Sequence, residues 1–244
     1  MDPIEDFRRE VAKSILESRE DAVFQRLSQA WMEKSVVHKY PYRFTWMGVP
    51  IIQYPQDIVA MQELVCLVKP DLIIETGIAH GGSLVFYASM LELLGGRGHV
   101  IGVDIDIRAH NRERLEQHPM FRRVSLVQGS SIAQETVKTV IDMASGFCNP
   151  LVVLDSMHTH SHVLDELRAY SHLIRKDSYI VVFDTLIEDM PESFYSDRPW
   201  SVGNNPKTAI DTFIDENDSF IVDNDIALKL MLTTCSCGFL RRVK

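Results

Sequence analysis

Five short apolar runs in this 244-residue sequence are each ended or followed at once by residues that can hold a ligand: Glu75, Asp104, Gly129-Ser130-Ser131, Asp155 and Asp184. Runs of this length are typical of buried strands, and the carboxyl ends of parallel strands form the ligand-binding edge of an open α/β sheet. We therefore expect these residues to meet along one edge. Four of the five positions are acidic, which is more than a surface of average charge requires.

The first run leads into a glycine-rich turn, Glu75-Thr-Gly-Ile-Ala-His-Gly-Gly-Ser83, and then into a helical pattern. Glycine lets the backbone turn tightly against a ligand, and the following helix directs free N–H groups into the turn. The spacing is not the Gly-x-Gly-x-x-Gly of a dinucleotide site, and no lysine precedes Ser83 as it would in a P-loop. With the acidic Glu75 in front, the pattern favours S-adenosylmethionine. The alternative is a strand-to-helix turn without a ligand.

Two further strand ends fit the same ligand. Asp104 can accept both ribose hydroxyls of an adenosine, and Ser130 with Ser131 can hold the adenine edge. The alternative for each is an ordinary helix N-cap, a position that aspartate and serine fill well. Asp106 fits the cap of the helix after Asp104 better, which favours Asp104 for the ribose.

Asp155 and Asp184 form a second group of acidic residues, at two neighbouring strand ends. Two carboxylates at close range repel each other unless a cation lies between them, and Mg²⁺ or a similar hard ion binds such oxygens. His158, on the loop after Asp155, can take a substrate proton near neutral pH. The alternatives are solvated carboxylates and a helix-capping histidine. His158-Thr-His160-Ser-His162 resembles a metal cluster, but no glutamate lies between His158 and His162 as in the His-Glu-x-x-His pattern of a zinc site, so zinc is disfavoured.

The elements that would position these residues alternate between strand and helix periodicity. We expect parallel strands and intervening helices over residues 72–183, then a helix and two late strands that form an antiparallel edge hairpin, as in methyltransferases. This order predicts an α/β fold with a doubly wound, mostly parallel, Rossmann-like sheet. The expected strands are 72–75, 99–104, 124–128, 151–155, 179–183, 220–222 and 238–243, and the expected helices are 55–68, 83–94, 108–117, 132–144, 160–174 and 207–216.

Residues 1–54 precede this alternation and are predicted to form a helical and aromatic extension to a domain of residues 55–244. Helical spacing runs over residues 4–33, with a break expected near Ser18-Arg19. The aromatic stretch over residues 40–50 contains proline and glycine, which exclude a long helix. It is either a lid over a site or a packed connection.

The bulk composition excludes several classes of protein. Hydrophobic residues make up 45% of the chain, which suffices for a globular core, and the net charge of −9 argues against general binding to nucleic acid or to an anionic membrane. The four cysteines do not have the spacing of a disulfide framework or a zinc site. No signal peptide and no membrane span is apparent, so we expect a cytoplasmic protein without a membrane partner.

Four motifs together resemble the cephalosporin hydroxylase family: Ile51-Ile-Gln-Tyr-Pro-Gln-Asp57, Ile74-Glu-Thr-Gly-Ile-Ala-His-Gly-Gly-Ser83, Leu154-Asp-Ser-x-His-x-His160 and Asn205-Pro-Lys-Thr-Ala209. The resemblance covers nearly the whole chain from about Tyr40. It implies an S-adenosylmethionine-dependent class I methyltransferase fold, a Mg²⁺ site, a role in antibiotic or sugar tailoring, and assembly into a homo-oligomer.

The sequence is also distantly similar to catechol-type O-methyltransferases. That resemblance implies that Asp155 and Asp184 are metal ligands and that His158 occupies the position of the base. Thr185 stands where that family has an asparagine ligand, and we carry it over as the third candidate ligand. Phe183 cannot be one.

These observations predict an O-methyltransferase that acts on a hydroxyl of a sugar or natural-product intermediate, with S-adenosylmethionine and Mg²⁺. His158 and Asp155 are the candidate catalytic residues, and the aromatic stretches 40–46 and 194–200 are candidates to cover the substrate. Two alternatives stay open: a non-haem iron oxygenase using His158, His160 and Asp155, and a non-catalytic binding protein on the same fold. The predicted cofactor-binding residues are Glu75, Thr76, Gly77, Ala79, Gly81, Ser83, Asp104, Ser130, Ser131 and Asp155.

Overall fold

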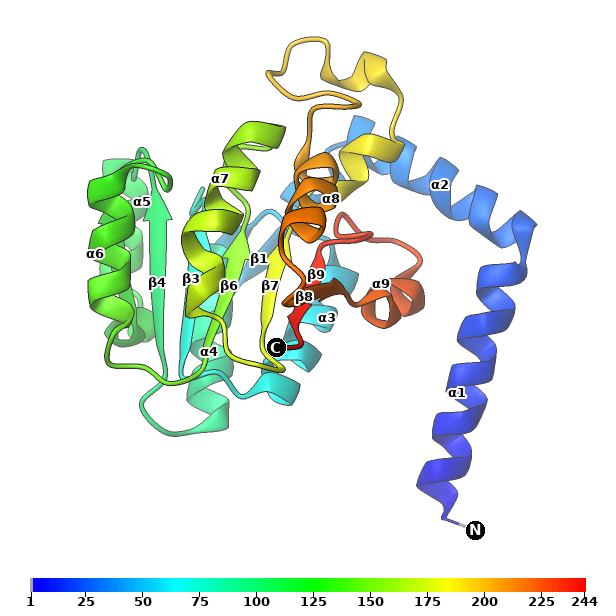
Figure 1. Ribbon diagram of the computed structural model, residues 1–244, viewed down its shortest axis with the longest axis horizontal. Coiled ribbons are helices and arrows are strands. Elements are labelled where there is room, and N and C mark those ends of the chain that lie inside the picture. Colours follow the sequence, from blue (N-terminus) through cyan, green and yellow to red (C-terminus); the bar gives the residue numbers. More distant parts are fainter. Residues whose placement is uncertain (1) are drawn as a thin grey trace.

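A computed structural model describes residues 2–244 and has a seven-stranded sheet at its centre (Figure 1). The strand order is β5-β4-β3-β6-β7-β9-β8, and the first five of these are mutually parallel. β9 pairs antiparallel with both β7 and β8, so it lies between them at the sheet edge. The strands are β3 (Leu72–Thr76), β4 (His99–Asp104), β5 (Val124–Gln128), β6 (Pro150–Leu154), β7 (Tyr179–Val182), β8 (Phe220–Val222) and β9 (Phe239–Arg242).

Helices cover both faces of the sheet, and each face has its own core of apolar side chains. One core joins the sheet to α3 (Pro55–Val68), α4 (Gly82–Leu94) and α5 (Ala109–Glu116), with α9 (Asn224–Leu230) at its margin. The other joins it to α6 (Gln134–Ala144), α7 (His160–Tyr170) and α8 (Pro206–Glu216). Because β3, β6 and β7 are covered on both faces, every residue in them is buried.

This architecture confirms the predicted fold class, including the antiparallel pair at the carboxyl-terminal edge. The predicted ranges of β4, β5, β8 and α3 match the structure residue for residue, and the other predicted elements differ by a few residues at their ends. The predicted helix over 160–174 ends as α7 at Tyr170 and continues as the short turn η3 (Ser171–Leu173). We did not predict α9, whose seven residues are too few to show a period.

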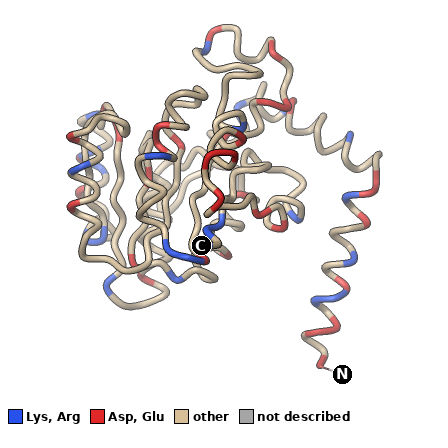
Figure 2. The backbone as a smooth tube through the Cα atoms, in the orientation of Figure 1, with Lys and Arg blue, Asp and Glu red and all other residues tan. Residues whose placement is uncertain are grey.

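The extension begins with α1 (Pro3–Glu20) and α2 (Ala22–Val37), which meet at Asp21. The break lies there and not near Ser18-Arg19, because the Asp21 carboxylate caps α2 by accepting the N–H groups of Val23 and Phe24. No residue of α1 is buried, and the helix projects away from the domain (Figure 1). Acidic and basic residues are interspersed along it (Figure 2).

The aromatic stretch after α2 is a packed connection that also reaches the site described below. It forms the turn η1 (Tyr40–Arg43) and a small hairpin of β1 (Phe44–Trp46) and β2 (Val49–Ile51). Trp46 packs edge-on against Phe86 and donates its indole N–H to Ser89 of α4 at 3.0 Å. These contacts confirm the packed connection, and the role of a lid stays a prediction.

No helix within residues 2–244 is both long and apolar enough to cross a membrane. The four cysteines are free thiols, as their spacing predicts.

Candidate active site

A cavity of about 640 Å³ opens at the carboxyl ends of the parallel strands. The strand order reverses around β3, which has β4 on one side and β6 on the other, and such a switch point leaves a crevice between the strand ends. The glycine turn after β3 and the loop after β6 form the floor of this crevice. Residues from α2 to Tyr54, from Phe183 to Trp200 and at Thr234 complete its walls.

The glycine turn is held in one conformation by its neighbours. Gly77 has φ of +89°, and a Cβ atom there would lie 2.0 Å from the backbone oxygen of Asp155. Asp104 at the end of β4 accepts the N–H groups of Ile78 at 2.8 Å and Ala79 at 3.3 Å. Gly81, with φ of +87°, precedes the first residue of α4. The turn therefore presents backbone N–H groups and no side-chain bulk to the crevice.

Asp104 also accepts the N–H of Asp106 at 3.0 Å, so it organises two loops and is still partly exposed. Arg108 occupies the N-cap position of α5 without a side-chain hydrogen bond. Our expectation that Asp106 caps this helix is wrong, because the helix starts two residues later than that role requires.

Glu75 and Thr76 lie beneath the crevice, and neither side chain lines it. Glu75 is completely buried, and burial raises the pKa of its carboxyl to about 8. One carboxyl oxygen accepts the hydroxyl of Ser83 at 2.6 Å, whereas the other has no hydrogen-bond partner among residues 2–244. An unpartnered buried acceptor this close to the turn is costly unless something donates to it. The Thr76 hydroxyl is also buried without a partner in the described chain.

Ser130 and Ser131 lie at the end of β5, outside the cavity wall. Ser131 is buried, its hydroxyl is 3.0 Å from His162 Nε2, and its carbonyl oxygen accepts the hydroxyl of Tyr170 at 2.7 Å. Ala133 occupies the N-cap position of α6, so neither serine caps that helix. The helix-cap alternative for this pair is therefore wrong.

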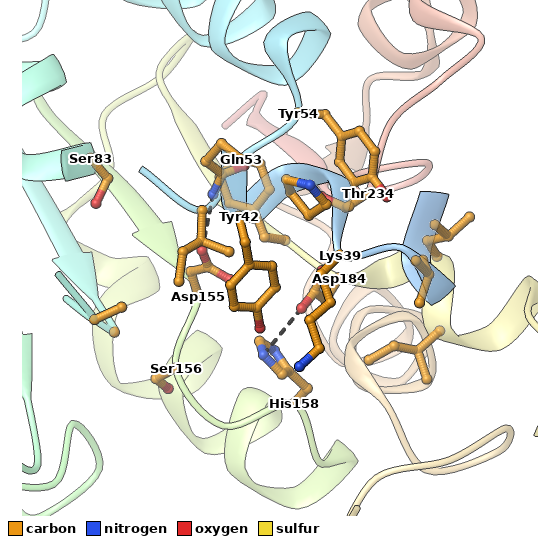
Figure 3. A pocket seen from close by; sticks show the side chains of 18 of the residues that line it. Lys39, Tyr42, Gln53, Tyr54, Ser83, Asp155, Ser156, His158, Asp184 and Thr234 are labelled. Atoms are coloured by element: carbon orange, nitrogen blue, oxygen red, sulfur yellow. Dashed lines mark hydrogen bonds and ion pairs between the residues drawn. The ribbon is translucent and has the colours of Figure 1, made fainter. Parts of the chain in front are cut away.

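Three side chains converge at the ends of β6 and β7: Asp155, His158 and Asp184 (Figure 3). A ligand atom from each lies within 4.8 Å of those from the other two. His158 Nε2 is 3.1 Å from Asp184 Oδ2, and the His158 ring meets the ring of Trp200 edge-on at 4.8 Å. Asp184 adopts a left-handed backbone conformation, with φ of +58°, which aspartate tolerates better than most residues.

No lysine or arginine of residues 2–244 lies within ion-pair distance of the Asp155 or Asp184 carboxylate. Burial and the nearby carboxylates of Asp184 and Glu75 raise the pKa of Asp155 well above its usual range. Within residues 2–244, the hydrogen bond to its carboxylate comes from the neutral amide of Gln53, at 3.0 Å. Two carboxylates and an imidazole at this separation fit a divalent cation, which would remove the repulsion. We found no comparable group of three such residues elsewhere in the described chain.

Thr185, predicted as the third metal ligand, does not lie with the two aspartates in the structure. Its side chain is completely buried and turned towards the segment before β9, where its hydroxyl donates to the carbonyl of Thr234 at 3.3 Å and lies 3.2 Å from Ser236 Oγ. Asp184 itself lines the cavity with a left-handed backbone conformation, whereas Thr185 is not part of the cavity wall. The third group within reach of the two aspartates is His158.

The three histidines that are close in sequence, His158, His160 and His162, have different neighbours in the structure. His160 Nδ1 is 2.9 Å from the hydroxyl of Thr208, whereas His162 lies 3.5 Å from the buried carboxylate of Glu166. His158 alone joins the aspartates. The ligand set of the iron oxygenase alternative, which needs His160 beside His158 and Asp155, is therefore not assembled.

Several residues of the site escaped sequence reasoning, although one motif contains the signal. Within Ile51–Asp57, Gln53 donates to Asp155, and the Tyr54 hydroxyl is 2.7 Å from that of Ser35 on α2. Asp57 accepts the hydroxyl of Thr233 and the N–H of Thr234. This motif therefore places three polar residues within five positions at the start of a helix. Each of the three forms a hydrogen bond to a different segment of the chain.

Both aromatic stretches contribute to the cavity wall. Tyr42 comes from the first, and Phe194, Tyr195 and Trp200 come from the second. Figure 3 shows the Tyr42 ring and the Lys39 chain over the His158–Asp184 pair. The second stretch packs with α2, where Met32 and Val36 contact the same apolar cluster as Phe194 and Tyr195. The extension is therefore part of the site.

Comparison with known proteins places this geometry in context. Residues 38–243 match the family model described as Rhamnosyl O-methyltransferase/CmcI. The Rhamnosyl O-methyltransferase of Mycobacterium bovis (strain BCG / Pasteur 1173P2) is 29% identical over 230 residues, covering 90% of this chain and 88% of that protein. That of Mycobacterium leprae (strain TN) is 26% identical over 148 residues, covering 60% and 62%.

Solved structures share the fold. CmcI with Mg and SAM has a TM-score of 0.58 at 20% identity and covers 83% of this chain and 78% of its own. Cofactor-bound Rv0187 from MTB has a TM-score of 0.53 at 16% identity, covering 87% of each chain.

Proposed function

Because the chain belongs to the Rhamnosyl O-methyltransferase/CmcI family, we propose that it transfers the methyl group of S-adenosylmethionine to a hydroxyl of a sugar or natural-product intermediate. The observation that supports this most is the position of Asp155, His158 and Asp184, which face the cavity beside the glycine turn. The turn would hold the donor and the cluster would hold the acceptor, so both reactants would meet at one edge of the sheet.

We assign the donor to the residues around the turn. The backbone of Gly77, Ala79 and Gly81 is shaped to approach a ligand, and Asp104 is partly exposed at the next strand end. Ser83 lines the cavity and would face the donor, with the buried Glu75 carboxyl behind it accepting its hydroxyl and keeping one unpartnered oxygen below the turn. The other predicted donor contacts are Thr76, Ser130, Ser131 and Asp155.

We assign a divalent cation, Mg²⁺ by preference, to Asp155 and Asp184. The donor supplies an electrophilic methyl group when bound, and the cation lowers the pKa of a hydroxyl that it binds. The Asp184 carboxylate has two oxygens, and only one of them is 3.1 Å from His158 Nε2. The other remains for the cation.

His158 is our candidate for the general base. With Nε2–H donating to Asp184, the imidazole is oriented and Nδ1 is the nitrogen that can take a proton, the arrangement that makes a histidine an effective base. The acceptor oxygen would lose its proton to His158 as its new bond to the methyl carbon forms and the sulfur–carbon bond breaks. The edge-on contact with Trp200 limits the positions that the ring can take.

Three finer assignments belong to the same proposal. We assign residues 1–54 to the extension and residues 55–244 to the donor-binding domain, although several residues between Val36 and Tyr54 also line the cavity. We propose a cytoplasmic homo-oligomer, supported by the exposed apolar side chains that α1 presents, among them Ile4, Phe7, Val11 and Leu16. Sedimentation of the full chain as a monomer would contradict the oligomer alone.

Binding and metal dependence test the function directly. S-adenosylmethionine and its demethylated product should raise the melting temperature, while NAD should not. Methylation of hydroxylated sugars should stop with EDTA and return with Mg²⁺ or Mn²⁺, and Asp155→Asn and Asp184→Asn should each weaken that return. Calorimetry that shows no binding of the donor or its product would overturn the methyltransferase assignment. Full activity in a metal-free preparation would leave the two aspartates with a structural role.

A further inference from the structure

Two basic residues line the cavity of a chain that is acidic as a whole, and the function proposed above does not use them. Lys39 lies between α2 and η1, and Arg198 lies on the loop between Phe194 and Trp200. The net charge of the protein is −9, so two cations facing one cavity are not what its composition predicts. Figure 3 shows the Lys39 side chain extending into the cavity towards Tyr42 and His158.

Neither cation is neutralised by a close carboxylate. Within residues 2–244, no carboxylate lies within ion-pair distance of the Lys39 ammonium group. Arg198 is 3.9 Å from Asp197, and 53% and 81% of these two side chains are exposed, so this pair contributes little. Both cations therefore keep their capacity to bind an anion from solution.

The aromatic wall places Arg198 near the reacting centre. Its guanidinium lies 5.5 Å from the centre of the Trp200 ring, a distance at which a cation is attracted to the ring face. Trp200 in turn contacts His158 at 4.8 Å. One ring therefore separates the guanidinium from the candidate base, which is within the length of a small acceptor.

The charge count favours an anion at this rim. A divalent cation would balance Asp155 and Asp184, which leaves Lys39 and Arg198 against Asp197 among the charged side chains of the cavity wall. We propose that the acceptor carries an anionic group, a phosphate or a carboxylate, that binds Lys39 and Arg198 while its hydroxyl lies at His158. This inference rests on the proposed function, since it concerns the acceptor of that same site. Arginine and lysine both bind phosphate and carboxylate oxygens through charge-assisted hydrogen bonds.

The chain offers matched controls for both residues. Lys69 follows α3 in the same left-handed conformation as Lys39, with φ of +49° against +48°, but it is outside the cavity wall. Arg97 is exposed in the turn between α4 and β4 and is also outside that wall. The double variants Lys39→Gln/Arg198→Gln and Lys69→Gln/Arg97→Gln change the net charge equally, so any difference between them reports on position.

The experiment is calorimetric titration of three sugars into protein held with Mg²⁺ and demethylated donor: glucose 1-phosphate, glucuronate and methyl glucoside. We expect both anions, or one of them, to bind the wild type more tightly than the neutral sugar. The Lys39→Gln/Arg198→Gln variant should lose about 10-fold or more in affinity for the anion and little for the glucoside, whereas the control variant should match the wild type. The better-bound anion identifies phosphate or carboxylate as the group recognised.

The outcomes separate this inference from the function beneath it. If the demethylated donor binds but the anions bind no better than methyl glucoside, or bind both double variants equally, the anionic subsite is wrong and the methyltransferase stands. If the demethylated donor itself fails to bind, the proposed function is wrong. Melting temperatures of the two variants, measured in the same buffer, show whether a loss of affinity reflects unfolding.

Discussion

The glycine turn and the acidic cluster meet at one edge of the sheet, but they are assembled from different amounts of chain. The turn lies within Gly77–Ser83, and its shape follows from glycine backbone angles and from hydrogen bonds to Asp104. The cluster takes its members from the ends of β6 and β7, and its supports come from Gln53 and Trp200. The first region is built of backbone and the second of side chains.

This difference has a physical consequence. Backbone geometry set by glycine cannot be adjusted without strain, because a Cβ at Gly77 would collide with the backbone of Asp155. Side chains held by single hydrogen bonds can be exchanged one at a time. We therefore expect changes in the acidic cluster to alter the reaction selectively, and changes around the turn to alter donor binding and folding together.

The largest effect should follow from removing the candidate base. His158→Ala should lower turnover by roughly 10²–10⁴-fold, the usual contribution of a general base, with little change in donor affinity. His160→Ala is the matched control, because His160 bonds to Thr208 and stands apart from the aspartates. It should lower the melting temperature and leave the turnover number nearly intact.

Turnover rates and donor affinities measured on both variants decide whether His158 acts as the base. Turnover of His158→Ala equal to that of the wild type at neutral pH would remove His158 from the mechanism. A similar fall in both variants would mean that the loop after β6 acts as a structural unit.

A second effect concerns the segment that supports the cluster. Asp57 is buried, and burial raises the pKa of its carboxyl to about 6 from 3.8. The folded protein therefore binds this proton more tightly than the unfolded chain, so its stabilising contribution is complete below about pH 4 and is lost as the pH rises through about 6. The difference between the two pKa values corresponds to about 3 kcal/mol of unfolding free energy.

Asp57→Asn does not titrate, so the variant should lack that loss. Denaturant unfolding of both proteins between about pH 4 and 7 should show the wild type losing stability relative to the variant across this range. A difference that stays constant with pH would mean that Asp57 is ionised in the fold at the lower end. The hydrogen bonds from Thr233 and Thr234 favour the ionised carboxylate and so lower the pKa of Asp57, but the effect of burial is larger and the loss of stability with rising pH remains.

The turn should respond differently to the loss of its own carboxylate. Asp104→Ala removes the acceptor of two turn N–H groups and the predicted ribose contact, which together should weaken donor binding by about 1.5–3 kcal/mol. Asp106→Ala is the control, because within residues 2–244 it is Asp104 and not the Asp106 side chain that accepts the N–H groups of the turn. Calorimetry should show weaker donor binding for the first variant only, and a falling melting temperature would show that the turn itself has loosened.

Sequence reasoning predicted the backbone-built region well because its signals are local. The strand, the glycines and the helix of this turn are adjacent in the chain, and each follows from short-range periodicity or backbone freedom. The acidic residues at strand ends could also be placed, since parallel strands end at one edge of the sheet. Asp155, His158 and Asp184 accordingly lie together.

The remaining features depend on contacts between segments far apart in sequence. Thr185 follows Asp184 directly, yet the left-handed turn at Asp184 sends its hydroxyl to Thr234. Nothing in the local sequence reports that direction. The same holds for Gln53, whose partner Asp155 is 102 residues away, and for Lys39 in the cavity wall.

Gln53 allows the smallest and most specific test of the contrast. Its amide donates to one oxygen of Asp155 at 3.0 Å, and this bond restrains the orientation of the carboxylate. Gln53→Leu keeps the volume of the side chain but removes this bond, and loss of a residue that orients a metal ligand commonly weakens metal affinity about 10–100-fold. We expect a value near 10-fold, because Asp155 keeps its place on the rigid end of β6.

The Mg²⁺ concentration needed for half-maximal activity should rise in Gln53→Leu, while turnover at saturating Mg²⁺ and affinity for the demethylated donor should change little. Gln62→Leu, on the partly exposed side of α3, is the control and should match the wild type. The contrary result is that Gln53→Leu lowers turnover at saturating Mg²⁺ without changing the Mg²⁺ requirement. That result would mean that Gln53 acts on the acceptor. The acidic cluster would then depend less on its supporting side chains than the contrast with the glycine turn implies.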